Sequence, residues 1–233
     1  MHPALIASLA VAGLLAGWPQ RALITRLAVP ADPLGPLGPD PHDPRDPRDR
    51  PAWLSRRLLA PAAGAVTAVL LVLLAARVHP ALVLAAACWL AGCAVPLAVI
   101  DVAVYRLPDP LTAAAYAGTA ALLLAAAAVT GPWPALLRAV LGGLALAGFY
   151  LLLAVISPSG MSLGDVKLAA SLGTLLAWFG WPLLIGGGFA GFLLGGIVAS
   201  ALLVHGKAGR KQPIPFGPFM IAGAVLAVIA QPG

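Results

Sequence analysis

The sequence predicts an all-α, polytopic helical membrane protein with about eight transmembrane helices. Of its 233 residues, 61% are hydrophobic and only 9% are charged, and the mean hydropathy is +0.97. A soluble domain of this size usually has about a quarter of its residues charged. Apolar runs of about 20 residues, the length that crosses a bilayer core, recur along the chain. Most of the folded surface is therefore expected to face lipid.

The first predicted span covers residues 3–24. Residues 4–17 resemble the apolar core of a signal peptide, but Arg21 and Arg26 follow this run instead of preceding it, so we interpret it as a membrane helix. The remaining spans are predicted at residues 58–76, 81–100, 111–130, 136–156, two within 168–204, and 216–230.

The breaks between these spans contain proline, glycine or charge. Arg77, His79 and Pro80 end the second span, and "YRLPDP", "GPWP" and "SPSG" follow the third, fourth and fifth. A turn near residues 180–182 separates the sixth from the seventh. The third helix is expected to continue for another turn beyond Asp101, through "VAVY".

Residues 25–57 form an Asp/Pro-rich stretch that divides the chain. It holds five of the eight aspartates (Asp32, Asp40, Asp43, Asp46 and Asp49), and the chain has no glutamate. Because proline removes backbone donors and disfavours helix before it, we expect a cytoplasmic linker without regular structure or chemistry. The predicted organisation is a first transmembrane helix (1–24), this linker (25–57) and a membrane domain (58–233).

The positive charges predict the topology. With the amino terminus outside, 12 of the 14 Lys and Arg residues follow the first, third, fifth and seventh spans, and only Arg77 and Arg138 lie on the other side. Cytoplasmic loops carry such an excess, so the net charge of +6 reports orientation and does not indicate nucleic acid. The same assignment places Asp101, Asp109 and Asp165 at the cytoplasmic face.

These three acids allow different interpretations. Asp101 ends an apolar helix, where the helix dipole disfavours an anion, so we interpret it as functional. Asp165 either acts in a site or closes a capping box with Ser162. Asp109 precedes Pro110 and is expected to be the N-cap of the fourth helix.

If Asp101 and Asp165 meet, they form a dyad that shares one proton. The ionised carboxylate takes a proton from water, and the protonated one polarises a scissile carbonyl. Neither a metal nor a covalent nucleophile is needed. The chain has few zinc ligands, and Cys88 and Cys93 lie within one apolar run, where neither a disulfide framework nor a metal site is expected. An ion- or proton-coupled transporter using the same aspartates, and an inactive assembly scaffold, remain alternatives.

Three segments, in the family's order, resemble type IV prepilin peptidases, which are GxGD-type membrane aspartyl proteases: "IDVAVYRLPDPLT", "GMSLGDVKLAASLG" and "PIPFGPFMIAGA". The resemblance implies a multi-pass protein of the inner membrane that removes the leader of type IV prepilin-like precursors, acts in pilus assembly and protein secretion, and needs no cofactor. It implies Asp101 and Asp165 as the catalytic pair. The implied supporting or substrate-binding residues are Ser162, Gly164, Lys167, Asp109, Pro215, Phe216 and Gly217. The implied partners are prepilin precursors and membrane lipid, with no nucleic acid.

Two departures from the family pattern matter. Ser162 replaces the first glycine of GxGD, and serine tolerates fewer backbone conformations than glycine. The linker at 25–57 stands where large members carry a domain with paired CxxC motifs that is tied to N-methylation of the new amino terminus. We therefore predict a short form that cleaves without methylating, or whose product another protein methylates. This architecture is compatible with Flp/Tad-type pilin substrates, among others.

Overall fold

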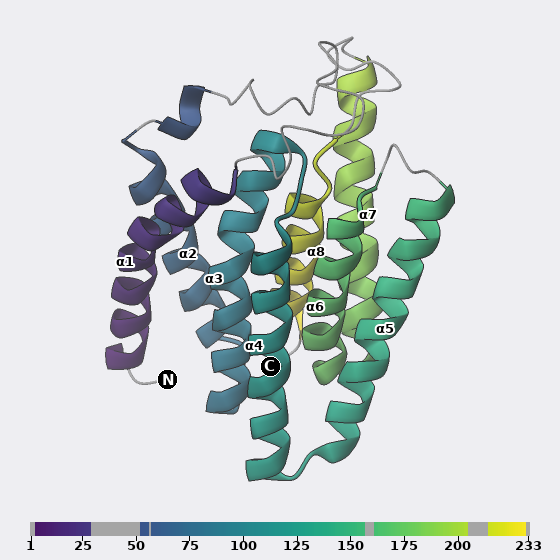
Figure 1. The fold of residues 1–233 in the computed structure, drawn as a ribbon. Helices are drawn as coiled ribbons and strands as arrows, with labels where there is room; N and C mark the ends of the chain where they lie inside the picture. Colours follow the sequence, from purple (N-terminus) through teal and green to yellow (C-terminus); the bar gives the residue numbers. More distant parts are fainter. Residues whose placement is uncertain (1–2, 29–51, 56, 157–160, 205–213, 232–233) are drawn as a thin grey trace.

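The computed structural model describes residues 3–28, 52–55, 57–156, 161–204 and 214–231. These residues form eight α-helices, one short 3-10 helix and no strand, which confirms the predicted all-α class (Figure 1). The α-helices are α1 (Pro3–Leu27), α2 (Leu59–Ala75), α3 (Ala81–Val104), α4 (Asp109–Thr130), α5 (Trp133–Ile156), α6 (Leu163–Phe179), α7 (Trp181–Val204) and α8 (Gly217–Ala230), and the 3-10 helix is η1 (Ala52–Ser55).

Each predicted span corresponds to one observed helix. The end of α3 and the beginning of α6 determine where two of the candidate site residues lie. Helix α3 continues to Val104, as predicted, so Asp101 lies inside its last turn. Helix α6 begins at Leu163 and not near Leu168, so Asp165 belongs to its first turn. Most of the predicted linker, residues 29–51, lies outside the described residues.

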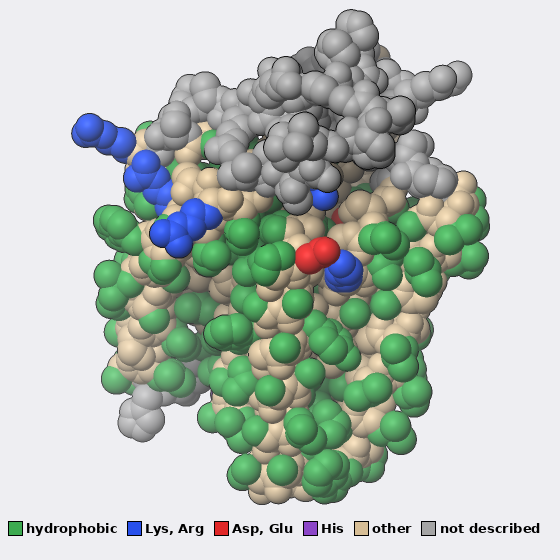
Figure 2. Space-filling model, viewed as in Figure 1, with side chains coloured by type: hydrophobic (Ala, Val, Ile, Leu, Met, Phe, Trp, Pro, Cys, Tyr) green, Lys and Arg blue, Asp and Glu red, His purple; other side chains and the backbone are tan. Residues whose placement is uncertain are grey.

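The described helices have the lengths and surface of a multi-pass membrane protein. Five of them (α1, α3, α4, α5 and α7) are long and apolar enough to cross a bilayer, and α2 and α8 are shorter apolar helices. Figure 2 shows hydrophobic side chains over most of one face, with the described charged side chains confined to its upper part. Such a surface suits lipid and would be a liability in water.

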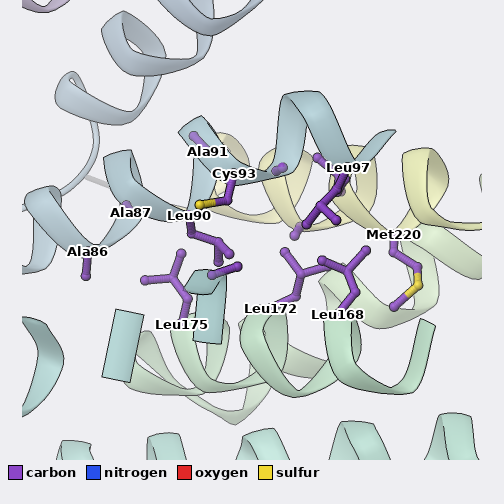
Figure 3. Packing of buried hydrophobic residues seen from close by; sticks show 14 of the residues in the cluster. Ala86, Ala87, Leu90, Ala91, Cys93, Leu97, Leu168, Leu172, Leu175 and Met220 are labelled. Atoms are coloured by element: carbon purple, nitrogen blue, oxygen red, sulfur yellow. The ribbon is translucent and has the colours of Figure 1, made fainter. Parts of the chain in front are cut away.

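Helix α6 forms the centre of the bundle. Most of its side chains are buried, and it packs against α3, α4, α5, α7 and α8. Figure 3 shows side chains that meet there: Leu90 and Leu97 of α3, Leu168, Leu172 and Leu175 of α6, and Met220 of α8. The helix that carries Asp165 is therefore held by apolar contacts along its length.

Buried and half-buried polar side chains join helices that are distant in sequence. Gln20 of α1 donates to Thr67 Oγ1 of α2 at 2.9 Å and to the Gly92 carbonyl of α3 at 3.0 Å. The Arg138 guanidinium of α5 donates to the carbonyls of Ala177 and Trp178 at 2.7 and 2.5 Å. Arg138 thus supplies hydrogen bonds to carbonyl groups in the last turn of α6, which have no partner within the helix, and a positive charge is favourable at this end.

Helices α7 and α8 approach each other so closely that only glycine fits at their crossing. A Cβ on Gly223 would stand 2.3 Å from the Gly191 nitrogen and 2.5 Å from the Gly187 oxygen. Small residues commonly permit this kind of close packing in membranes. The contact fixes α8, whose first residue enters the site described below.

We predict that Gly223→Ala lowers the free energy of unfolding by about 1–3 kcal/mol, because the added methyl group meets backbone that cannot move aside. Gly196→Ala on α7 is the matched control, since a Cβ there has no neighbour within 4 Å. Unfolding of both purified variants in the same detergent checks this. Equal stability of the two variants would contradict the packing argument.

Candidate active site

The antiparallel order of the helices gathers four helix ends at the upper end of the bundle in Figure 1. There the carboxyl end of α3 meets the amino ends of α4, α6 and α8. Asp101, Asp165 and Gly217, which are far apart in sequence, belong to these ends. Since backbone N–H groups at helix amino ends are unpaired, this end of the bundle is suited to hold anions.

Asp101 lies in the last turn of α3 and is only 4% exposed. Its Oδ2 accepts the backbone N–H of Gly217 at 2.9 Å. Gly217 is the first residue of α8, so the amino end of one helix supports a carboxylate that the carboxyl end of its own helix disfavours.

Asp165 is the third residue of α6 and is also 4% exposed. Its Oδ2 accepts the backbone N–H of Ser162 at 2.8 Å and the Ser162 hydroxyl at 2.9 Å, while the Asp165 N–H approaches Ser162 Oγ at 3.3 Å. This is the predicted capping box. The other oxygen, Oδ1, is buried and has no hydrogen-bond partner. The Asp165 side chain therefore closes the helix cap with Oδ2 and keeps Oδ1 without a partner.

The structure brings the two aspartates together. Their carboxylates are near enough to interact electrostatically. Two like charges in a poorly solvated interior resist joint ionisation, so the pair is suited to hold one proton between them. No group of three His, Cys, Asp or Glu side chains that could hold a metal occurs among the described residues.

The replacement of the motif glycine by Ser162 fits the local backbone. Ser162 has φ −102° and ψ 159°, an extended conformation open to any residue. The replacement of glycine by serine therefore causes no backbone strain at this position. The serine hydroxyl adds a hydrogen bond to Asp165 that glycine lacks.

Gly164 and Gly217 are required for close approach. A Cβ on Gly164 would lie 2.8 Å from Leu107 Cβ, in the loop between α3 and α4. A Cβ on Gly217 would lie 2.9 Å from Asp101 Oδ2. These glycines let the α3–α4 loop pack on α6, and let α8 place its N–H on the carboxylate.

The predicted N-cap role of Asp109 is wrong. The N-cap of α4 is Pro108, in extended conformation, and Asp109 is the first helical residue with no capping hydrogen bond from its side chain. Pro108 already has the backbone conformation a cap needs, and Pro110 needs no N–H in the first turn. Asp109 instead pairs with Lys167 of α6 at 2.6 Å.

The Lys167–Asp109 pair lies at the rim of the site. The two side chains are 48% and 74% exposed, so the pair contributes little to stability. It does join the beginning of α4 to α6 beside the buried dyad. Lys167 and Asp109 thus lie at the rim with their charges directed to each other.

The segment before α8 carries aromatic rings. Pro215 leads into Phe216, whose ring centroid lies 6.0 Å from that of Tyr150, 5.5 Å from Phe192 and 6.2 Å from Phe219. Phe216 is therefore part of an aromatic cluster formed by α5, α7 and α8. This cluster abuts the residue that binds Asp101.

Sequence reasoning missed Tyr150. It is 1% exposed in α5 and interacts electrostatically with Asp165. The available signal was a single hydroxyl-bearing ring within the apolar run "GFYLLLAVI", a short distance before the loop that leads to Asp165.

The fold and the site define a class: a helical membrane protein with two buried aspartates paired at one end of its bundle. The profile of the type IV leader peptidase family matches residues 84–202, about half of the chain, and this range includes both aspartates. The chain belongs to the type IV leader peptidase family.

Curated relatives agree with this family. The chain is 33% identical over 106 residues to a prepilin leader peptidase/N-methyltransferase of Bacillus subtilis (46% of this chain, 42% of the relative). It is 31% identical over 165 residues to the Aeromonas salmonicida protein of the same name (70% and 55%). It is 43% identical over 65 residues to the leader peptidase HopD of Escherichia coli (27% and 39%). The matches therefore span only about half of these relatives or less, and no solved structure matches the chain.

We predict that Ser162→Ala lowers the free energy of unfolding by about 0.5–2 kcal/mol, because it removes a helix cap and leaves part of a buried carboxylate unsolvated. Ser162→Gly, which restores the motif glycine, costs less at a cap. Thermal unfolding in detergent measures both.

Ser8→Ala is the matched control, since the Ser8 hydroxyl is exposed and bonds only the Leu5 carbonyl of its own helix. An effect of Ser162→Ala no larger than that of Ser8→Ala would argue against a structural role for the capping box.

Proposed function

We propose that this chain is a membrane aspartyl endopeptidase that removes the leader peptide of type IV prepilin-like precursors. The observation that carries the proposal is the pairing of Asp101 and Asp165, both 4% exposed, at one end of the bundle in a member of the type IV leader peptidase family. The relatives named prepilin leader peptidase supply the substrate class.

The hydrogen bonds suggest different roles for the two acids. Asp165 Oδ2 receives two donors from Ser162 at the amino end of α6, an arrangement that favours the charged carboxylate. Asp101 receives the single N–H of Gly217 and stands at the carboxyl end of α3, which favours the protonated form. We assign Asp165 as the general base and Asp101 as the general acid.

The reaction then proceeds in two steps. Asp165 takes a proton from water while the water oxygen attacks the scissile carbonyl carbon, and Asp101 gives its proton to the carbonyl oxygen. In the second step Asp165 returns its proton to the amide nitrogen, the C–N bond breaks, and Asp101 recovers a proton from the tetrahedral carbon's hydroxyl. The dyad ends as it began, and water has been added across one peptide bond.

The position of the dyad suits such a substrate. Both aspartates lie within one turn of a helix end, so the dyad belongs to one end of the bundle and not to its middle. A precursor whose own apolar helix lies in the bilayer would present the bond just before that helix at this depth. The basic groups near the site would contact anionic lipid headgroups and would not attract a basic leader.

We propose that this end faces the cytoplasm, in the inner membrane. The described basic residues at the dyad end are Arg21, Arg26, Arg57, Arg106 and Lys167, and those toward the other end are Arg77 and Arg138. The excess at the dyad end supports the orientation given by the positive-inside rule. The remaining basic residues of the linker and of the segment after α7 lie outside the described residues.

We propose precursors of the Flp/Tad type as the first substrates to test, and cleavage without N-methylation. The support is the segment between α1 and α2, which is rich in Asp and Pro and contains no cysteine. The two cysteines, Cys88 and Cys93, both lie in α3. A paired CxxC domain of the kind tied to methylation is thus missing from this stretch of the chain.

We predict that Asp101→Asn and Asp165→Asn each abolish leader removal while the protein still inserts and folds, because neither amide can exchange the proton that the mechanism moves. Co-expression with candidate precursors and gel analysis of leader removal measure this. Membrane yield and thermal unfolding verify that the variants fold.

Asp109→Asn is the matched comparison, since its exposed carboxylate contacts only Lys167. We expect it to lose less than about tenfold in activity, in line with the small worth of exposed ion pairs. Full cleavage by either dyad variant would exclude the aspartyl mechanism. Proton or ion flux in vesicles without cleavage of any precursor would favour a transporter.

We also predict that the mature product leaves this protein with an unmodified amino group. Mass spectrometry of a precursor cleaved by the purified chain, with and without S-adenosylmethionine, measures it. A methylated product formed only with S-adenosylmethionine would overturn this part of the proposal.

A further inference from the structure

Tyr150 is buried, yet its hydroxyl has no hydrogen-bond partner among the described residues. The side chain as a whole is 1% exposed within α5. The ring is held by edge contact with Phe149 at a centroid distance of 5.7 Å and by a tilted contact with Phe216 at 6.0 Å. Packing alone would be served equally well by phenylalanine, because the ring makes these contacts and the hydroxyl takes no part in them.

Tyr150 is linked to both halves of the dyad. Tyr150 interacts electrostatically with Asp165. Its neighbour Phe216 directly precedes Gly217, whose N–H binds Asp101. The aromatic contacts therefore tie Tyr150 both to the carboxylate of α6 and to the segment that supports the carboxylate of α3.

The other donors that contact the dyad are already engaged. The Ser162 N–H and hydroxyl bind Asp165, and the Gly217 N–H binds Asp101. Lys167 is directed to Asp109 at the rim. Tyr150 is a buried side chain whose hydroxyl has no partner among the described residues, so this hydroxyl is free to bond another molecule.

We propose that Tyr150 is a further catalytic residue, whose hydroxyl donates a hydrogen bond to the scissile carbonyl oxygen of the substrate. This inference rests on the proposed peptidase function. As the carbonyl carbon becomes tetrahedral, its oxygen gains negative charge, and a donor fixed in a poorly solvated site stabilises that charge. Tyr150 keeps its proton throughout, while Asp101 supplies the proton that the oxygen receives.

The aromatic contacts explain how the donor is oriented. Phe216 and Phe149 fix the plane of the Tyr150 ring, so little reorganisation is needed when the charge develops. Since the hydroxyl acts only when charge appears, its contribution falls on the chemical step more than on binding.

The test is Tyr150→Phe, which keeps the ring and removes only the hydroxyl. We expect kcat for a precursor processed by the wild type to fall about 100- to 1,000-fold, the usual effect of losing one such donor, with KM changed less than about threefold. Steady-state cleavage by the purified full chain in lipid nanodiscs measures both. The melting temperature should not fall, because the variant keeps the ring contacts and breaks no hydrogen bond between described residues.

Tyr116→Phe is the matched control, because Tyr116 of α4 is 40% exposed and lies outside the site; it should keep the wild-type kcat. A wild-type kcat for Tyr150→Phe, or a loss confined to KM, overturns the role of Tyr150 and leaves the peptidase intact. A loss of kcat matched by an equal loss of melting temperature also overturns it. If the wild type cleaves no precursor and the dyad variants behave like it, the proposed function fails together with this inference.

Discussion

The site depends on keeping two carboxylates out of water without leaving them unsupported. A buried carboxylate is tolerated only where donors replace its solvation. Asp165 finds them in Ser162, within its own helix cap, and Asp101 finds one in Gly217, at the beginning of another helix. Each donor group belongs to the amino end of a helix, so the bundle's antiparallel order supplies the support.

This requirement explains residues that perform no chemistry. The N–H of Gly217 reaches Asp101 because no Cβ fills the space between them, and α8 reaches that position because Gly223 lets it pack on α7. Gly164 similarly admits the loop between α3 and α4 against α6. The small residues therefore set where the carboxylates meet.

Much of this arrangement could be predicted from local pattern. The apolar runs give the helices, and the breaks between them give their order. Because the helix dipole disfavours an anion at a carboxyl end, Asp101 could be distinguished from a capping residue. The spacing of Ser162 and Asp165 predicts the capping box. The predicted N-cap of α4 differs from the observed one by a single position, because Pro110 suits the second helical residue as well as the first and the pattern does not distinguish these two.

What could not be predicted involves partners from other helices. Nothing within a few residues of Asp101 indicates that the N–H of Gly217 binds it, and nothing near Tyr150 indicates Asp165. Helix-period arguments relate residues three or four apart, whereas these contacts depend on which helix faces which. The family resemblance indicates these segments, but the hydrogen bonds among them depend on how the helices pack in three dimensions.

The placement of the acids also favours hydrolysis over transport. A carrier site needs its ionisable groups near the bilayer midplane, so that both sides can reach them in turn. Asp101 lies three residues before the end of α3, and Asp165 is the third residue of α6, so both belong to one end of the bundle. Nearly the full length of the bundle, packed with leucine and alanine, separates these two aspartates from the opposite end. A site at one end of the bundle faces one side of the membrane, which suits hydrolysis and does not suit alternating access.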